Sequence, residues 1–202
     1  LAKCQPFYSP NKLNGNIFLG GDHSLTYYLF KKFSKNNKDA GLIIFDAHPE
    51  CYEQFEFPTH GDWILHLIKD KLIDSSKIIF VGVRAGTEKE IKFFKDNKIK
   101  CFYMKDIYGN LDNVCDVVME NARSFGSLYV SIDIDAADPA YAPATGFLEP
   151  GGLTSRELIR FMQRLKLLKN LKVMDIVEVN PEIDINNMTS KLAARLIAEL
   201  MG

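Results

Sequence analysis

Five residues that could bind a cation lie in two short segments of the sequence. Asp46, His48 and Glu50 occupy every second position after an apolar run, and Asp133 and Asp135 lie two positions apart in a second segment. On an extended chain, residues two apart point to the same side, so each segment gathers its polar groups. Carboxylates and an imidazole at the end of a buried strand do not stabilise a fold, and their presence indicates a bound ligand.

Two further polar segments follow apolar runs. His23 lies in GGDHS at 20–24, and Glu178 precedes Asn180-Pro181. The chain has only four histidines, and His60, like His23 and His48, falls in a polar segment. His66 is different, because it lies at helical spacing among apolar residues, and we interpret it as a helix-packing or surface residue.

The gathered carboxylates predict bound cations. Four carboxylates in one crevice would repel one another and lose hydration, which is costly in a buried site. Two divalent cations would remove that difficulty. Mixed histidine and carboxylate ligands suit Mn²⁺, Fe²⁺ or similar ions, and Zn²⁺ is also compatible. Each residue alone has an ordinary structural explanation, such as a helix cap for His23 or Asp46. Their occurrence at the ends of four strands favours a functional site.

Apolar runs alternate with amphipathic stretches along the chain. We expect strands at 17–19, 42–45, 78–83, 99–103, 128–134 and 173–179, and helices at 25–33, 62–71, 88–96, 111–123, 155–168 and 190–200. This alternation, with continuously apolar strands, predicts an α/β fold with a mostly parallel sheet between two helical layers. Ligands of such sheets bind beyond the carboxyl ends of the strands. The Gly/Pro-rich segment 138–152 follows one of these ends.

Bulk composition narrows the class of protein. The 202 residues predict one domain over 1–202, and a net charge of −1 gives no reason to expect nucleic acid or a membrane as partner. No apolar run approaches the ~20 residues of a membrane span. We interpret the cysteines as reduced thiols of a cytoplasmic protein, since their spacing shows no CxxC pair. They are Cys4, Cys51, Cys101 and Cys115.

The motifs together resemble the ureohydrolase (arginase/agmatinase) family. The matching segments are GGDHS at 20–24, DAHPE at 46–50, SIDIDAADPAYAPATG at 131–146, EPGGLTSREL at 149–158 and DIVEVNP at 175–181. The fourth is more similar to the agmatinase branch than to the arginase branch. The resemblance implies an arginase-like three-layer α/β/α fold. The family normally carries more structure before GGDHS, so this chain is either a compact member or lacks N-terminal elements of the sheet.

The resemblance also implies a set of metal ligands and catalytic groups. It makes His23, Asp46, Glu50 and Asp133 ligands of one Mn²⁺, and Asp46, His48, Asp133 and Asp135 ligands of a second. Asp46 and Asp133 would bridge the two. Glu178 matches the acid that holds the substrate guanidinium, and His60 matches the histidine that shuttles protons. Family members are commonly homo-oligomers, which we expect here.

The implied reaction is hydrolysis of a guanidino or amidino C–N bond by metal-activated hydroxide, releasing urea and an amine. An agmatinase-like activity on a small molecule is our prediction. The alternatives are an arginase, a formiminoglutamase-type hydrolase, a hydrolase of another C–N substrate, or a non-catalytic metal-binding or interaction member. A related metal-dependent deacylase is disfavoured, because its pattern has an adjacent His-His pair that this sequence lacks.

Two departures from the family pattern matter. Glu50 replaces the usual Asp of the DAHxD motif, and a Glu reaches one methylene further. Cys51-Tyr52-Glu53 does not reproduce the Asn-containing segment by which arginases recognise an amino-acid substrate. The first departure makes the loading of one metal site an open question, and the second disfavours arginine as substrate.

Overall fold

The protein is built on a seven-stranded sheet with the strand order β1-β2-β7-β6-β3-β4-β5. This computed structural model describes residues 6–8 and 16–201. β1 pairs antiparallel with β2, and the other neighbouring strands pair in parallel. The strands are β1 (Pro6–Tyr8), β2 (Asn16–Leu19), β3 (Ala40–Phe45), β4 (Ile78–Val83), β5 (Lys100–Tyr103), β6 (Ser127–Asp133) and β7 (Leu171–Val177).

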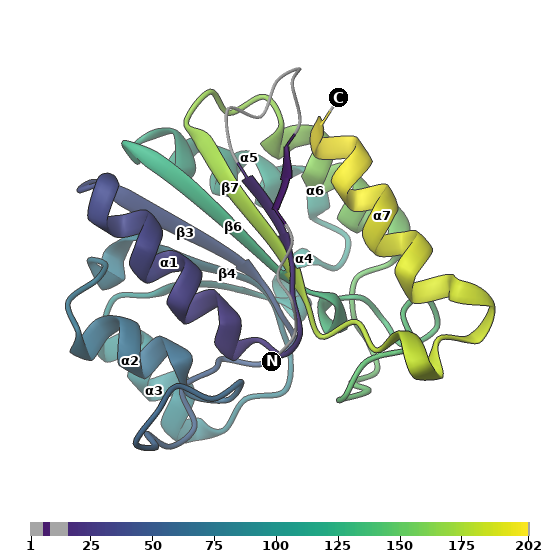
Figure 1. Cartoon of the computed structure of the whole chain (residues 1–202), viewed down its shortest axis with the longest axis horizontal. Coiled ribbons are helices and arrows are strands. Elements are labelled where there is room, and N and C mark those ends of the chain that lie inside the picture. The colour runs from purple at the N-terminus through teal and green to yellow at the C-terminus, as the bar shows by residue number, and fades with distance from the viewer. Residues whose placement is uncertain (1–5, 9–15, 202) are drawn as a thin grey trace.

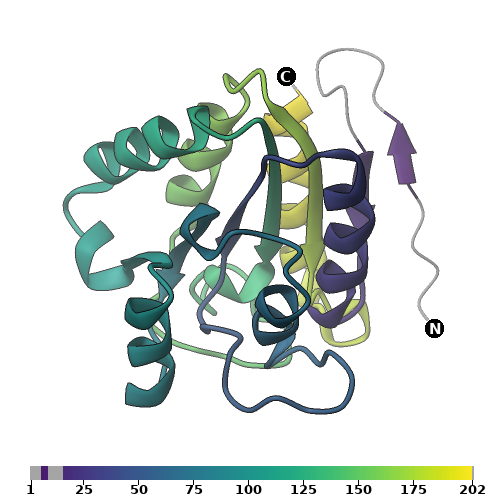
Figure 2. The same ribbon diagram turned by 90° about the vertical axis from the view of Figure 1, so that its left-hand side faces the viewer.

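Helices cover both faces of the sheet. They are α1 (Ser24–Asn36), α2 (Trp63–Lys69), α3 (Glu88–Asp96), α4 (Met104–Ile107), α5 (Leu111–Arg123), α6 (Ser155–Leu165) and α7 (Met188–Met201). Buried residues of α1, α2 and α3 form one core cluster, and those of α5, α6 and α7 form the other. Figure 1 shows these two groups on opposite sides of the strands, and Figure 2 shows α1 and α2 in front of the sheet with the yellow α7 behind it.

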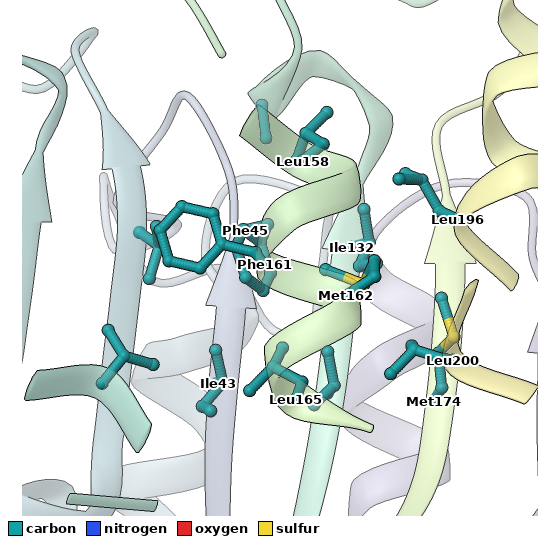
Figure 3. Close-up of a cluster of buried hydrophobic side chains, with 14 of the residues drawn as sticks. Ile43, Phe45, Ile132, Leu158, Phe161, Met162, Leu165, Met174, Leu196 and Leu200 are labelled. Carbon is teal, nitrogen blue, oxygen red and sulfur yellow. The ribbon is translucent and has the colours of Figure 1, made fainter. Parts of the chain in front are cut away.

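The strands are apolar on both sides because both sides are packed. Every residue of β3 and of β4 is buried. Ile43 and Phe45 point to the α5–α7 side, whereas Leu42 and Ile44 point to the α1–α3 side. Figure 3 shows Phe45 against Phe161 of α6, with ring centroids 5.1 Å apart. The expected three-layer α/β/α fold with a mostly parallel sheet is therefore confirmed.

Most predicted elements are present, with shifted ends. The helices predicted at 88–96 and 111–123 have those bounds, and a capping box of Thr154 and Glu157 opens α6. β1 and the short helix α4 were not predicted, because three or four residues carry too little periodicity.

The predicted strands 128–134 and 173–179 extend too far. β6 ends at Asp133, whose Oδ1 accepts a hydrogen bond from the backbone N of Asp135 (2.9 Å) and turns the chain into a 3₁₀ helix. β7 ends at Val177 because Glu178 adopts a left-handed backbone (φ 64°). Asp135 is therefore not on an extended strand, and the predicted shared side of Asp133 and Asp135 does not apply.

The order of the strands creates a crevice between β3 and β6. The chain leaves β3 through α2 on one face of the sheet and leaves β6 through α6 on the opposite face. Adjacent parallel strands whose crossovers depart to opposite faces open a binding crevice at their carboxyl ends. Asp46 follows β3 and Asp133 ends β6, so the two acids lie at this point of the fold.

Among the helices that the structure describes, none has the length and apolarity that a bilayer crossing requires. Cys51, Cys101 and Cys115 are free thiols, as predicted, and Cys4 lies outside the described residues.

Candidate metal centre

His23 is held at the start of α1 by a close approach of two chain segments. It follows β2 and Gly20, where a Cβ atom would come within 2.8 Å of the side chains of Leu25 and Val177. Glycine therefore allows the chain to pass next to β7 and place His23 over the sheet. The imidazole is 1% exposed. Its Nδ1 lies 3.1 Å from Asp46 Oδ2 and 3.1 Å from Asp133 Oδ2.

Asp46 and Asp133 are arranged alike around that imidazole. Asp46 Oδ1 accepts a hydrogen bond from the backbone N of His48 (2.7 Å), and Asp133 Oδ1 accepts one from the backbone N of Asp135 (2.9 Å). In each acid, one oxygen binds the backbone two residues later and bends the chain there, and the other oxygen points toward His23. The D-x-H and D-x-D spacing consequently fixes the two carboxylates as well as supplying the next polar side chain.

His48 forms the second half of the cluster. Its Nδ1 lies 3.0 Å from Asp135 Oδ2 and 3.5 Å from Asp46 Oδ1. Asp135 is in turn held by the backbone N of Ala47, which donates to its Oδ1 (3.0 Å). On the outer side, His48 Nε2 faces Glu149 Oε1 at 3.7 Å. Asp46 therefore lies between His23 and His48, with one oxygen near each.

Glu50 is buried, 6% exposed, and its Oε2 has no hydrogen-bond partner. Its backbone is left-handed (φ 55°), a conformation that costs a non-glycine residue about 1 kcal/mol. Glu50, Asp46 and His48 offer ligand atoms that all lie within 4.8 Å of one another, as do His23, Asp46 and Asp133. The structure therefore groups Glu50 with His48, whereas the resemblance groups it with His23.

Burial and mutual repulsion govern the protonation of the cluster. Burial raises the pKa of Glu50 and of Asp133 well above the usual range, and neighbouring carboxylates add to the effect. For His48, burial lowers the pKa, but Asp135 and Asp46 outweigh it and raise the pKa to about 11. Cations bound among these groups would offset the repulsion that opposes ionisation of the carboxyls.

The donor set fits divalent cations. His23 Nδ1, Asp46 Oδ2 and Glu50 Oε2 are buried and have no hydrogen-bond partner in the structure. Buried polar atoms without a partner are rare in folded proteins, and carboxylate oxygens around imidazole nitrogens are the ligands that transition-metal ions prefer. The six predicted ligands His23, Asp46, His48, Glu50, Asp133 and Asp135 thus lie in one cluster at the β3/β6 crevice.

A cavity of about 850 Å³ opens from this cluster to the surface. His48 and Glu50 line its inner end, and His60 lies in its wall on the loop between β3 and α2. Phe147 lies across from both histidines, with ring centroids 5.7 Å from His48 and 5.8 Å from His60. Tyr52, Phe55 and Glu149 also line the cavity. The predicted proton shuttle therefore shares a cavity with two predicted ligands.

Glu178 lies on the other side of His23. Its Oε1 accepts a hydrogen bond from the backbone N of His23 (2.7 Å), and it lines a separate cavity of about 260 Å³. Burial raises the pKa of Glu178. An ion pair with Arg84 would be the structural explanation for this acid, but Arg84 instead donates to backbone carbonyls, including those of Asp135 and Glu149 (2.7 Å each).

His66 is a helix-packing residue, in line with the sequence analysis. It is 5% exposed, and its Nε2 lies 3.2 Å from Asp62 Oδ2.

Sequence reasoning overlooked the groups behind the ligands. Asp175, Ser131 and Trp63 are fully buried next to His23 or its partners. Thr145 has a buried hydroxyl without a partner. A signal was available for two of them, because Asp175 and Ser131 are polar residues inside apolar strands.

The fold and the cluster together define a three-layer α/β/α protein with a candidate centre for divalent cations. The sequence profile of the Arginase family matches residues 4–202. An arginase of Staphylococcus aureus is 32% identical over 202 residues, covering 92% of this chain and 67% of the relative. A formimidoylglutamase of Halalkalibacterium halodurans is also 32% identical, covering 90% of this chain and 58% of the relative.

Solved structures agree with this comparison. The crystal structure of arginase from Bacillus subtilis superimposes with a TM-score of 0.86 at 27% identity, covering 92% of this chain and 71% of that one. The chain belongs to the arginase family.

Proposed function

We propose that the protein is a binuclear metal hydrolase that cleaves a guanidino or amidino C–N bond and releases urea and an amine. The observation that carries the proposal is the cluster of buried histidine and carboxylate ligand atoms at the β3/β6 crevice, next to a large cavity. In it, His23 Nδ1 lies 3.1 Å from an oxygen of each of two carboxylates, and Glu50 Oε2 has no hydrogen-bond partner. Family membership supports the same reaction class.

Two Mn²⁺ ions are the proposed cofactors. Asp46 and Asp133 are proposed to be shared by the two ions. In support, each directs an oxygen toward His23 and each fixes the segment that carries the next proposed ligand. His48 and Asp135 complete one side, and Glu50 is close enough to Asp46 and His48 to ligate there. When bound, such ions neutralise the carboxylates and lower the pKa of water toward 7.

The chain's own residues would orient the substrate and move its protons. A guanidinium is inert because its charge is delocalised, so its placement accounts for much of the catalysis. Glu178 lines the smaller cavity and not the one that His60 lines, and it is proposed to hold that group from there by a charge-assisted hydrogen bond. Its Oε1 is fixed by the His23 backbone, and its Oε2 faces Gly146. His60, in the cavity wall, is proposed to give a proton to the leaving amine.

An agmatinase-like substrate is the finer proposal. The cavity wall is aromatic and carries the carboxylate of Glu149, and none of its lining residues that the structure describes is Lys or Arg. Such a wall suits a substrate whose far end is an amine rather than a carboxylate. Formimino substrates are the second candidate, favoured by the similarity to a formimidoylglutamase. A homo-oligomer is proposed from family membership.

A single substrate panel tests the function. Mn²⁺-loaded protein is incubated with agmatine, arginine, guanidinobutyrate, guanidinopropionate and a formimino amino acid, and urea and formamide are assayed. Urea from agmatine is the expected result. Formamide alone would favour the second candidate, and release of neither product from any compound would refute the proposed hydrolase.

A further inference from the structure

A buried carboxylate lies behind His23, on the side away from Asp46 and Asp133. Asp175 of β7 is fully buried and accepts hydrogen bonds from three hydroxyl groups. The donors are Thr26 Oγ1 (2.9 Å), Tyr129 OH (2.5 Å) and Ser131 Oγ (2.6 Å). Ser131 in turn lies 3.0 Å from His23 Nε2. The parallel register of β6 and β7 sets Ser131 directly beside Asp175, so the strands themselves build this arrangement.

The number of available protons decides the direction of each bond. A hydroxyl has one proton to donate, and the proton of Ser131 goes to Asp175. The Ser131 oxygen can then only accept from His23 Nε2. Thr26 Oγ1 lies 3.3 Å from Ser131 Oγ but donates to the same carboxylate, so it does not change this result. The proton of a neutral His23 imidazole therefore lies on Nε2.

We infer that Asp175, acting through Ser131, is a positioning residue that fixes His23 as the Nε2–H tautomer and leaves the Nδ1 lone pair for a cation between Asp46 and Asp133. The inference rests on the proposed metal hydrolase. Metal-ligating histidines commonly donate their second N–H to a partner that fixes the ring. Here that partner is a serine oriented by an acid on the neighbouring strand, and Asp175 itself does not touch His23.

The burial of Asp175 supports a role beyond stability. A carboxylate inside a strand of the sheet loses its hydration, and apolar residues would pack there at lower cost. An amide at position 175 could not serve the same purpose. Its NH₂ group would donate toward one hydroxyl, so Ser131 could turn its proton toward His23 Nε2 and favour the Nδ1–H tautomer, which cannot ligate.

The test compares Ser131→Ala and Asp175→Asn with Tyr129→Phe as the matched control. Ser131→Ala and Tyr129→Phe each remove one hydroxyl that donates to Asp175, and Asp175→Asn replaces the accepting carboxylate by an amide. Only Tyr129→Phe leaves the contact between Ser131 and His23 in place. Mn²⁺ binding is titrated by electron paramagnetic resonance, and folding is checked by circular dichroism. We expect Ser131→Ala and Asp175→Asn to weaken one of the two Mn²⁺ sites by about 10- to 100-fold, the usual effect of losing such a partner. Tyr129→Phe should leave both sites within about threefold of the parent.

The double variant Ser131→Ala/Asp175→Asn should lose no more affinity than the stronger single variant, because the two residues act in series. Wild-type affinity in folded Ser131→Ala would overturn the inference while leaving the metal hydrolase intact. An equal loss of Mn²⁺ affinity in Tyr129→Phe would also overturn the inference, since any change at Asp175 would then weaken binding without acting through Ser131. If the parent protein binds no Mn²⁺, the proposed function itself fails. Should Asp175→Asn not fold, Ser131→Ala decides alone.

Discussion

The indole of Trp63 packs against the imidazole of His23, with ring centroids 4.7 Å apart and planes inclined by 45°. His23 lies at the start of α1 and Trp63 is the first residue of α2, so the contact joins the two helices beside the candidate metal centre. Both side chains are buried. Trp63 is also the only tryptophan in the sequence, which makes it a natural reporter for this site.

We predict that Mn²⁺ quenches the intrinsic fluorescence of the protein in a saturable manner. A paramagnetic ion held by His23 would lie close to the indole that packs on its ring. The measurement is a fluorescence titration of metal-free protein, reversed with EDTA. In His23→Asn, the same titration should give little quenching. If electron paramagnetic resonance shows full Mn²⁺ binding but the fluorescence does not change, the metal binds away from His23.

Glu50 should lower the stability of the metal-free protein and strengthen Mn²⁺ binding. In metal-free protein its carboxyl is buried, one oxygen has no partner, and the charge of Asp46 opposes its ionisation. We predict that Glu50→Met raises the free energy of unfolding of metal-free protein by about 1 kcal/mol, since an unsatisfied buried group is removed. The same change should weaken Mn²⁺ binding. Urea unfolding in EDTA and a Mn²⁺ titration measure the two effects.

Glu90 provides the matched control for Glu50. It is equally buried, but its carboxylate accepts hydrogen bonds from Thr87 N (2.9 Å) and Thr87 Oγ1 (2.8 Å) in a capping box. Glu90→Met should therefore lower the free energy of unfolding by about 1 kcal/mol. If both variants are destabilised alike, Glu50 has a partner in solution and is not poised for a cation.

The sequence identified the ligand cluster because its members follow strands. Apolar runs located β3 and β6, and the rule that ligands bind at the carboxyl ends of parallel strands located Asp46 and Asp133. What the sequence did not predict was the turn of the backbone directly after the strand. Asp133 turns its own backbone by accepting from Asp135 N, an effect that period-two reasoning does not contain.

Contacts between distant segments were not predictable from one sequence. The partnership of Asp175 with Ser131 depends on the register of two strands that are separated by α6. The packing of Trp63 on His23 depends on how α1 and α2 meet. Grouping Glu50 with His48 needed its left-handed backbone, which residue type alone does not indicate for a glutamate.

The loop that carries His60 is anchored by Asp62. This fully buried carboxylate accepts from Thr59 N (2.6 Å), Thr59 Oγ1 (2.7 Å) and Phe55 N (2.7 Å) and contacts His66. We predict that Asp62→Asn lowers the free energy of unfolding by about 3 kcal/mol at pH 7, because an amide cannot accept all of these bonds. Urea unfolding measures the loss.

The pH dependence of that loss follows from the pKa of Asp62. Burial alone raises this pKa, but the donors of Phe55 and Thr59 outweigh it and lower the pKa below its usual value. A lowered folded-state pKa gives stability that is present above the unfolded value of about 4 and is lost as pH falls through the folded one. The difference between parent and variant should thus be constant above about pH 5 and shrink below 4.

The exposed Asp74 is the control for Asp62. It makes similar bonds to Ser76 N (2.9 Å) and Ser76 Oγ (2.8 Å), but water can replace them. Asp74→Asn should have a clearly smaller effect than Asp62→Asn. Equal losses would mean that burial of Asp62 adds nothing to the anchoring of the loop.

Arg84 and Gly152 together hold the segment 138–152 over the cavity. Arg84 Nη2 donates to the carbonyls of Asp135 and Glu149, and a Cβ on Gly152 would lie 2.6 Å from both Arg84 Nη2 and Asp138 N. We predict that Gly152→Ala lowers the free energy of unfolding by about 2 kcal/mol, because it displaces the guanidinium and meets backbone. Gly61→Ala should change it by less than about 1 kcal/mol, since a Cβ added there would meet no heavy atom within 4 Å outside its chain neighbours.

Hydrogen exchange of residues 138–152 locates the effect of Gly152→Ala. We expect faster exchange there and unchanged exchange in β3 and β4, because Arg84 reaches the segment only through its guanidinium. Arg84→Lys, which loses the forked donors, should produce the same local pattern, and the double variant should lose less stability than the sum of the two single losses. If the two losses of stability add exactly in the double variant, Gly152 is needed only to avoid a clash with the backbone at Asp138. Arg84 then acts on the segment independently of Gly152.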